Sequence, residues 1–350
     1  MSYFVTGATG FIGRFLVPEL LKREGDVHVL VRPGSERKLA ARARAWGAED
    51  RIKPVPGDLS HPMLGIDPQW IEEHRGLAHM FHLAAIYDLT ASEERNETLN
   101  NGGTRQAVAV ANALAVGTLH HTSSVAAAGL YEGKFTEDMF DEGQRLPSPY
   151  HRTKFESEKI ARDEATVPWR VYRPSIVVGD SRTGEMDKID GPYYFFKLLK
   201  LAAAAPSALP LFVPSLGDTN VVPVDFVARA MDHIAHVPGL DGKAFHLVSP
   251  EPQNSIALMN AFAQYAGAPR MTELLPKQVM HLAMRVPGVQ RQVLPRLGIP
   301  AEAIEHTEFT CRFDATQTVA ALVGTDIAVP PIEDYAGVLW KYWERNLAGQ

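Results

Sequence analysis

Short apolar runs alternate with longer amphipathic segments over the first two-thirds of the chain. The apolar runs predict β-strands, and several are apolar nearly throughout, as expected of strands buried on both faces of a parallel sheet. This alternation predicts an α/β fold, a doubly wound parallel sheet with helices on both faces. The predicted strands are Tyr3–Thr6, Val27–Val31, Ile52–Pro56, His79–Leu83, Leu119–Ser123 and Trp169–Tyr172. The predicted helices are Ile12–Arg23, Arg37–Ala45, Gln69–Glu73, Gly103–Leu114 and His151–Glu164.

The pattern changes after about residue 178, where prolines become frequent and the segments become shorter. We therefore expect a core formed by residues 1–178, to which 220–250 adds a further strand or helices. Residues 179–350 are expected to form mainly a smaller, mixed region with a binding or lid role.

Composition and charge narrow the class of protein. The 350 residues are 45% hydrophobic and 22% charged, and the net charge is −6, which argues against a dedicated nucleic-acid binder. Cys311 is the single cysteine, so an intrachain disulfide and a cysteine metal cluster are excluded and a reducing, cytoplasmic compartment is favoured. No signal peptide is recognisable, and the apolar stretch Leu198–Pro214 is interrupted by a lysine and two prolines.

A glycine-rich turn, Thr6-Gly7-Ala8-Thr9-Gly10-Phe11-Ile12-Gly13, joins the first strand to the first helix. Gly7 allows a tight turn, Gly10 lets the backbone approach a pyrophosphate, and Gly13 allows close packing of helix and strand. The free N–H groups at the start of the helix attract phosphate. We therefore expect a dinucleotide to bind along Gly7, Thr9, Gly10, Phe11, Ile12 and Gly13.

The end of the second strand predicts which dinucleotide binds. NAD sites usually place an acidic residue there, whereas this chain has Arg32, followed by Arg37 and Lys38. A guanidinium suits a 2′-phosphate, so the sequence favours NADPH over NADH. After the third strand, Asp58-Leu59 offers a carboxylate that could bond the adenine amino group.

Tyr150 and Lys154 stand four residues apart on a predicted helix and so share one face. An ammonium beside a phenol favours the phenolate, and such a tyrosine can protonate an alkoxide that forms from a carbonyl. Ser124 ends a strand and can orient the same oxygen. Tyr193 and Lys197 repeat the spacing, but without an upstream serine, and their stretch is better interpreted as an apolar wall.

These motifs resemble the extended short-chain dehydrogenases/reductases, and more narrowly the N-terminal module of bacterial two-module fatty acyl-CoA reductases. Asn101 departs from the family, which usually has an apolar residue there. The matching motifs are the glycine turn, Asp58-Leu59, His82-Leu83-Ala84-Ala85, Asn100-x-x-Gly103-Thr104, Ser123-Ser124, Tyr150-x-x-x-Lys154, Arg173-Pro174 and Pro223-Val224-Asp225-Phe226-Val227. The narrower branch is suggested by Tyr87, Arg173–Gly179, Gly191–Phe196 and Phe309-x-Cys311-x-Phe313-Asp314.

The resemblance implies roles for individual residues. Tyr150 is similar to the general acid/base, and Lys154 to the residue that lowers its pKa and holds the nicotinamide ribose. Ser124, favoured over Ser123 by its distance to Gly129, is similar to the residue that polarises the carbonyl. The same resemblance assigns Ala84, Ala85, Pro174 and Ile176 to the cofactor site.

The resemblance also implies an activity, the NADPH-dependent reduction of a long-chain fatty aldehyde to the alcohol. Reduction of a fatty acyl-CoA or other thioester is the alternative, and a second reductase module is an expected partner. The apolar segment from Leu274 to Leu297, rimmed with arginines, could cover an acyl chain or contact a membrane surface, or simply pack as a lid. Two other classes stay open, a nucleotide-sugar epimerase or dehydratase and a non-catalytic cofactor sensor. No metal site is expected from His120-His121 or from His233 and His236.

Overall fold

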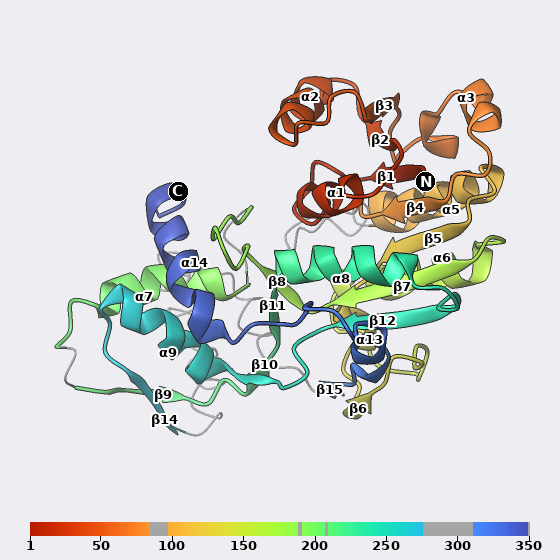
Figure 1. The fold of residues 1–350 in the computed structure, drawn as a ribbon. Coiled ribbons are helices and arrows are strands. Elements are labelled where there is room, and N and C mark those ends of the chain that lie inside the picture. The colour runs from red at the N-terminus through yellow and green to blue at the C-terminus, as the bar shows by residue number, and fades with distance from the viewer. Residues whose placement is uncertain (85–96, 188–190, 207–208, 276–310, 349–350) are drawn as a thin grey trace. The chain divides into compact units, whose positions relative to one another are not determined.

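The fold comes from a computed structural model, in which residues 1–84, 97–187, 191–206, 209–275 and 311–348 are described (Figure 1). The chain divides into two compact units. The first unit holds the described parts of 1–175, 224–248 and 311–327. The second unit holds the described parts of 176–223, 249–310 and 328–350.

The first unit is built on a seven-stranded parallel sheet with the order β12-β7-β5-β4-β1-β2-β3. The central strands are rich in valine, phenylalanine and histidine and are buried nearly throughout, as parallel strands covered on both faces must be. The strands are β1 (Tyr3–Thr6), β2 (Val27–Val31), β3 (Ile52–Pro56), β4 (His79–His82), β5 (Thr118–Thr122), β7 (Trp169–Pro174) and β12 (Lys243–Leu247).

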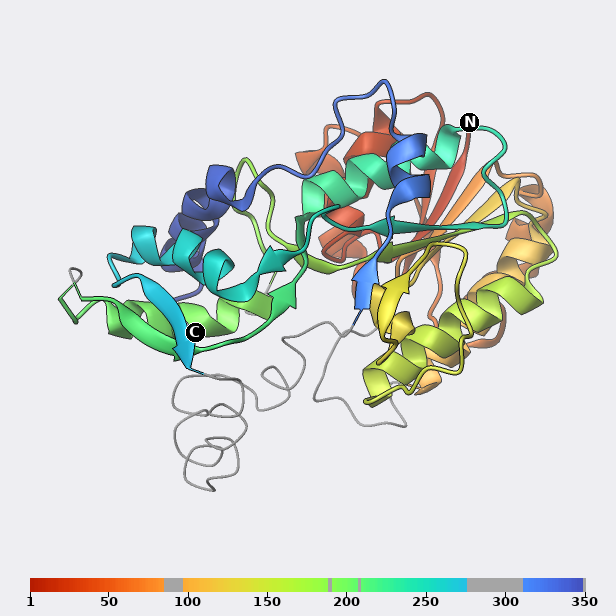
Figure 2. The same cartoon turned by 90° about the horizontal axis from the view of Figure 1, so that it is seen from below.

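Helices cover both faces of this sheet. Figure 2 shows the α8 and α6 layers on opposite faces, and α1 packs against α8 while α5 packs against α6. The helices of the unit are α1 (Gly13–Leu21), α2 (Glu36–Ala45), α3 (Pro68–Glu73), α5 (Gly103–Ala113), α6 (Pro149–Glu164), α8 (Val224–His236) and α13 (Thr316–Ala321). Short helical turns are η1 (Pro62–Gly65), the π-helical η2 (Glu97–Gly102) and η3 (Val125–Ala128). The predicted doubly wound α/β fold is confirmed, and the predicted strands and helices are found with their ends displaced by two residues at most.

Residues 311–327, near the carboxyl end of the chain, pack in the first unit. β15 (Cys311–Phe313) pairs in parallel with β6 (Gly133–Phe135). The Glu137 carboxylate, 1% exposed, accepts hydrogen bonds from the His246 N–H (2.8 Å), the Thr318 hydroxyl (2.6 Å) and the Gln317 N–H (2.5 Å). One buried side chain therefore joins the β6 segment, β12 and the start of α13.

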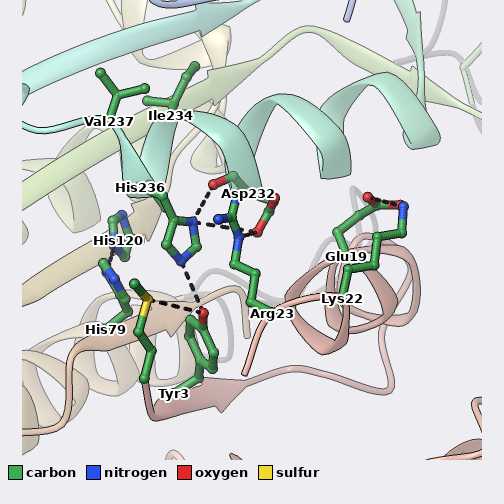
Figure 3. Close-up of polar contacts among 12 residues, drawn as sticks. Tyr3, Glu19, Lys22, Arg23, His79, His120, Asp232, Ile234, His236 and Val237 are labelled. Carbon is green, nitrogen blue, oxygen red and sulfur yellow. Dashed lines mark hydrogen bonds and ion pairs between the residues drawn. The ribbon is translucent and has the colours of Figure 1, made fainter. Parts of the chain in front are cut away.

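A cluster of aromatic and histidine side chains lies against the sheet near the amino ends of its strands (Figure 3). The Tyr3 hydroxyl bonds His236 Nε2 at 3.0 Å, and His79 Nδ1 bonds His120 Nε2 at 3.0 Å. On the same network, His120 Nδ1 bonds the Tyr172 hydroxyl at 3.0 Å. Burial lowers the pKa of His79 to about 4 and that of His120 well below its usual value. These histidines are therefore neutral near pH 7 and belong to the core.

An ion pair beside this cluster ties α1 to α8. Arg23 follows α1 and donates from Nε and Nη2 to the two carboxylate oxygens of Asp232 on α8, both at 2.9 Å (Figure 3). At the end of α8, Arg170 of β7 donates to the backbone oxygens of Ile234, Ala235 and Val237. The last carbonyls of a helix have no partner within it, so Arg170 closes this end of α8.

The second unit has its own aromatic core. Phe196, Phe262, Trp340 and Trp343 are buried, with Phe196 ring centroids 4.6–5.4 Å from the other three. The helices are η4 (Gly191–Phe195), α7 (Phe196–Ala202), α9 (Ser255–Ala266) and α14 (Ile332–Asn346). Short strands pair in twos: β8 (Ile176–Val178) with β11 (Val221–Pro223), β9 (Leu211–Pro214) with β14 (Met271–Leu275), and β10 (Asp218–Thr219) with β13 (Gln253–Asn254). Among the described residues, no helix has the length and apolar character needed to cross a membrane.

Candidate functional site

The residues predicted for the site follow the carboxyl ends of neighbouring parallel strands in the first unit. Because these ends share one edge of the sheet, the loops that leave them lie next to one another, where open α/β sheets bind their ligands. The glycine turn follows β1, Arg32 follows β2, and Asp58 follows β3. Ala84 follows β4, and Ser124 follows β5.

The glycine turn is held so tightly that two of its positions exclude a side chain. Gly7 has φ +77°, and a Cβ there would lie 2.7 Å from the backbone nitrogen of Ala84. A Cβ on Gly13 would lie 2.2 Å from the backbone oxygen of Gly7. The N-cap of α1, Ile12, offers no side-chain hydrogen bond, and the first turn carries no acidic residue. A phosphate can therefore approach the backbone N–H groups at this helix start, so the turn fits a dinucleotide.

A buried hydrogen-bond chain fixes the turn to the neighbouring strand and helix. Thr6 Oγ1 bonds His82 Nδ1 at 2.8 Å, and His82 Nε2 bonds Thr104 Oγ1 of α5 at 3.2 Å. Burial lowers the pKa of His82 to about 3, so the imidazole is neutral and bridges two hydroxyls. This role was not predicted, although His82 stands inside a recognised motif.

The basic residues predicted to select the cofactor are exposed. Arg32 lies directly after β2, and Arg37 and Lys38 lie in the first turn of α2. Asp58 Oδ1 accepts hydrogen bonds from the Ser60 N–H (2.8 Å) and hydroxyl (2.7 Å), which lower the pKa of Asp58, and Arg32 lowers it further. Arg32 and the Asp58 carboxylate therefore lie close enough to interact, with the carboxylate ionised.

The predicted tyrosine and lysine lie on α6. Ser148 caps this helix, accepting from the His151 N–H at 3.4 Å and bonding His151 Nδ1 at 2.8 Å. Tyr150 is half-buried in the first turn, whereas Lys154, one turn later, is 7% exposed. Burial lowers the pKa of Lys154 to about 8, against the attraction of Glu158.

The two candidate serines differ in their surroundings. The Ser124 backbone is extended and its Oγ accepts from the Ala126 N–H at 3.2 Å, capping η3, which packs against α6. A hydroxyl that accepts with its oxygen can still donate its proton to a substrate oxygen. Ser123 is 2% exposed, and its hydroxyl helps to lower the pKa of the buried Glu158. Ser124 therefore caps the turn that packs against α6, whereas the Ser123 hydroxyl lies beside the buried Glu158 of α6 itself.

The π-helical turn η2 brings two asparagines against α6. The Asn100 side-chain amide donates to Thr153 Oγ1 at 3.5 Å, and that of Asn101 donates to Glu156 Oε2 at 2.5 Å. Asn101 is the position where the chain departs from the family, and the bond to Glu156 is the local reason that a polar residue suits it. Isolated π-helical turns are frequent at functional sites.

The other predicted residues belong to different parts of the chain. Ala85 and Tyr87 lie outside the described residues, as does most of the apolar segment between Leu274 and Leu297. Pro174 ends β7 in the first unit, whereas Ile176 begins β8 in the second unit. Tyr193 belongs to the core of the second unit, where its hydroxyl accepts from the Gly179 N–H at 2.7 Å, so its stretch is an apolar wall as predicted.

The described part of the chain holds no group of three or more His, Cys, Asp or Glu side chains arranged to bind a metal ion. The adjacent His120 and His121 point to opposite faces of the sheet, as alternation along a strand requires. His120 bonds His79 and Tyr172, and His121 stacks on His82 with centroids 5.6 Å apart.

Comparison with known proteins identifies the family. The profile of the family described as "Male sterility protein", a group of NAD-binding domains, matches residues 5–231. The chain belongs to this family of extended short-chain dehydrogenases/reductases. The family assignment establishes an NAD(P)-binding domain and an oxidoreductase class. Among the curated relatives of this extended reductase is aldehyde reductase lnaA of Aspergillus flavus, 30% identical over 281 residues, which cover 72% of this chain and 26% of the relative.

Two solved structures show the same fold. The terminal R domain from the myxalamid PKS-NRPS biosynthetic pathway has a TM-score of 0.80 at 23% identity, covering 99% of this chain and 91% of that one. A thiolation-reductase di-domain from an archaeal non-ribosomal peptide synthetase has a TM-score of 0.74 at 17% identity, covering 98% and 75%. The chain spans only 5–31% of the length of the first curated relatives, which are multidomain synthetases.

Proposed function

We propose that this extended reductase is an NADPH-dependent reductase of an aldehyde or of an acyl thioester. The observation that supports this most strongly is the placement of Tyr150 and buried Lys154 one turn apart on α6, with Ser124 at the start of the η3 turn that packs against that helix. A dinucleotide would be held by the glycine turn after β1, at the same edge of the sheet.

In this proposal, individual residues of the chain have the following roles in the reaction. The reduced nicotinamide, when bound, supplies a hydride to the carbonyl carbon. The Ser124 hydroxyl donates a hydrogen bond to the carbonyl oxygen, and Tyr150 transfers its phenolic proton to the same oxygen as the C=O double bond becomes single. Lys154 stabilises the phenolate that Tyr150 becomes until solvent returns the proton. An aldehyde gives an alcohol in this way, whereas a thioester gives a hemithioacetal that separates into aldehyde and thiol.

The two substrate classes have different support. The sequence motifs favour a long-chain fatty aldehyde, reduced to the alcohol as part of a fatty acyl-CoA reductase activity. The relatives include aldehyde reductases and terminal reductase domains of peptide synthetases, which favour an acyl group presented as a thioester by a partner module. A substrate of either class has one carbonyl oxygen to be bound by the hydroxyls of Ser124 and Tyr150. The chemistry assigned to these two residues is therefore the same for both classes.

The choice of NADPH depends on the second strand. Arg32, Arg37 and Lys38 give an exposed basic surface after β2, where a 2′-phosphate would lie. A guanidinium binds phosphate through charge-assisted hydrogen bonds, which the 2′-hydroxyl of NADH cannot form with the same strength.

The proposal is tested by following NADPH and NADH oxidation at 340 nm with a medium-chain aldehyde, the matching acyl-CoA and the matching acyl-pantetheine thioester. We expect oxidation of NADPH with the aldehyde or a thioester, at least tenfold faster than with NADH. Turnover of the aldehyde alone would assign to this chain the reduction of aldehyde to alcohol. Turnover of a thioester would assign to it the reduction of the thioester to the aldehyde as well. Absence of turnover with all three, from protein that binds NADPH, would refute the proposal.

A further inference from the structure

Four long side chains repeat at intervals of one turn along α6: Tyr150, Lys154, Glu158 and Arg162. Residues four apart lie on one helix face, so these side chains form a continuous stripe. Lys154 and Glu158 are 7% and 0% exposed, so the middle of the stripe is buried against the sheet. Of the residues in this stripe, the proposed reaction uses only Tyr150 and Lys154, which leaves the buried carboxylate of Glu158 without an assigned role.

Glu158 is held by two arginines. Arg173 of β7, 0% exposed, donates from Nη2 to Glu158 Oε1 at 2.6 Å and from Nε to Oε2 at 3.0 Å. Arg162 donates from Nε to Glu158 Oε1 at 2.9 Å. Arg173 is itself anchored, since Nη1 lies 3.1 Å from His246 Nε2 and Nη2 donates to the Met139 carbonyl at 2.9 Å. This network fixes the carboxylate one helical turn below Lys154.

The carboxylate stays ionised despite its burial. Burial would raise the pKa of Glu158, but the attraction of Arg173 and its hydrogen bonds outweigh this and lower the pKa to about 2. A buried ammonium one helical turn away is stabilised across that distance, because Coulomb attraction is strong where water is excluded. Burial lowers the pKa of Lys154 to about 8, so the lysine titrates close to physiological pH and a neighbouring charge decides its state.

We propose that Glu158, anchored by Arg173, is a positioning residue of the reaction that keeps Lys154 protonated at neutral pH. The inference rests on the proposed function, in which the Lys154 ammonium stabilises the Tyr150 phenolate. Glu158 acts through Lys154 and touches no reacting atom.

Apart from Tyr150, which the titration below replaces with phenylalanine, the titratable groups around this pair do not change charge between pH 6 and pH 9. His82 on β4 and His121 on β5 lie near Lys154, and burial keeps the pKa of each well below 6.5. His246 on β12 faces Arg173, and burial lowers its pKa to about 3. Arginine side chains in general keep their charge throughout this range. The titration of Lys154 therefore reports on the charge of Glu158.

The experiment measures that titration directly, in protein without cofactor that carries Tyr150→Phe throughout and is otherwise wild type. Lysine labelled with ¹³C at Cε is incorporated, the Cε shifts are followed from pH 6 to pH 10, and Lys154→Met assigns the resonance. In Glu158→Gln we expect the midpoint of Lys154 to fall by at least one pH unit, a tenfold change in its protonation constant. A midpoint within 0.3 unit of the wild-type value would overturn the proposal. In active enzyme, the alkaline limb of the kcat/KM profile should move in the same direction.

Matched variants separate this effect from a loss of structure. Glu164→Gln makes the same change on the same helix at an exposed ion pair with Arg105, and should leave the Lys154 midpoint unchanged. Glu158→Asp keeps the charge and should restore the midpoint to within about half a unit. Arg162→Gln removes a cation that shares Glu158, so the Lys154 midpoint should rise.

The rise in Arg162→Gln keeps the proposal testable if Glu158→Gln does not fold, because the Arg162 side chain is 17% exposed and lies nearer the surface than Glu158. A fall or no change in that variant would contradict the proposal. A titration as expected, together with wild-type protein that shows no reductase activity, would instead count against the proposed function alone.

Discussion

At the scale of single residues, the proposed proton transfer depends on one hydroxyl. Replacing Tyr150 with phenylalanine removes the proton donor while keeping the ring, so we expect kcat to fall by about 10²–10⁴-fold. Binding of NADPH should stay within about threefold of the wild-type value, because the glycine turn and Lys154 are unchanged. Steady-state turnover and a fluorescence titration with NADPH measure the two effects. Tyr193→Phe, which alters a buried hydroxyl in the second unit, is the control for loss of a tyrosine hydroxyl.

Retention of normal turnover in Tyr150→Phe would show that another group donates the proton. Ser124 is the next hydroxyl on the same side of the proposed site, so Ser124→Ala would then have to carry the larger loss.

Arg32 is the residue on which the proposed preference for NADPH depends. It is exposed at the end of β2, so Arg32→Ala should not disturb the fold, and we expect the Kd for NADPH to rise by roughly 10- to 100-fold. The Kd for NADH should change by less than threefold, because NADH has no 2′-phosphate. Arg44→Ala, an exposed arginine at the far end of α2, serves as the control. Equal weakening of both cofactors would refute the assignment of Arg32 to the 2′-phosphate.

The local geometry of the proposed site was predictable where it depends on residues close in the sequence. A Cβ at Gly7 or Gly13 would collide with the backbone, and Lys154 lies one helical turn after Tyr150. The spacing of these residues in the sequence was therefore enough to predict the tight turn and the shared helix face. Glu158 was not predicted, although the four-residue spacing from Lys154 was a usable signal. Its role depends on Arg173, which comes from a strand beyond the helix and meets it only in the folded chain.

At the scale of elements, the repeating strands and helices of residues 3–174 were predictable from hydrophobic alternation, because the central strands are buried on both faces. The segment 311–321 was not predictable as part of this unit. β15 is three residues long, and its pairing with β6 joins positions almost 180 apart in the chain. The polar carboxylate of Glu137, rather than an apolar pattern, holds the start of α13 in place, and hydrophobic periodicity gives no signal for such a contact.

That role of Glu137 makes a prediction about stability. Glu137→Ala leaves the Thr318 hydroxyl and the N–H groups of His246 and Gln317 without their buried acceptor, so the free energy of unfolding should fall by about 3 kcal/mol. Equilibrium unfolding in urea measures the loss. Glu132→Ala removes an exposed glutamate from the same segment and should change stability by less than about 0.5 kcal/mol. A loss of that small size in Glu137→Ala would mean that residues 311–327 are held by other contacts.

At the scale of the whole molecule, several strands of the sheet carry buried histidines. Four histidines are almost wholly buried on three sheet strands: His82, His120, His121 and His246. Desolvation lowers the pKa of each well below 6.5, to about 3 for His82 and His246. The folded chain therefore holds these imidazoles neutral under conditions in which the unfolded chain would protonate them.

The consequence is a loss of stability in mild acid. Below pH 6.5 the unfolded state binds protons that the folded state excludes, so the stabilisation present above pH 6.5 is lost as the pH falls toward the folded-state pKa values. Each histidine that stays neutral in the folded state loses about 2 kcal/mol between pH 7 and pH 5, and four of them approach the total stability of a typical domain. Glu158, with a pKa of about 2 in the folded chain, contributes to acid sensitivity only below pH 4.5, so the loss of stability between pH 5 and pH 7 is assigned to the histidines.

We expect the urea midpoint to decrease steeply between pH 7 and pH 5. The variant His61→Gln, which changes an exposed histidine, should leave this pH profile unchanged. A urea midpoint that stays flat from pH 7 to pH 5 would show that the buried histidines do not govern stability in acid.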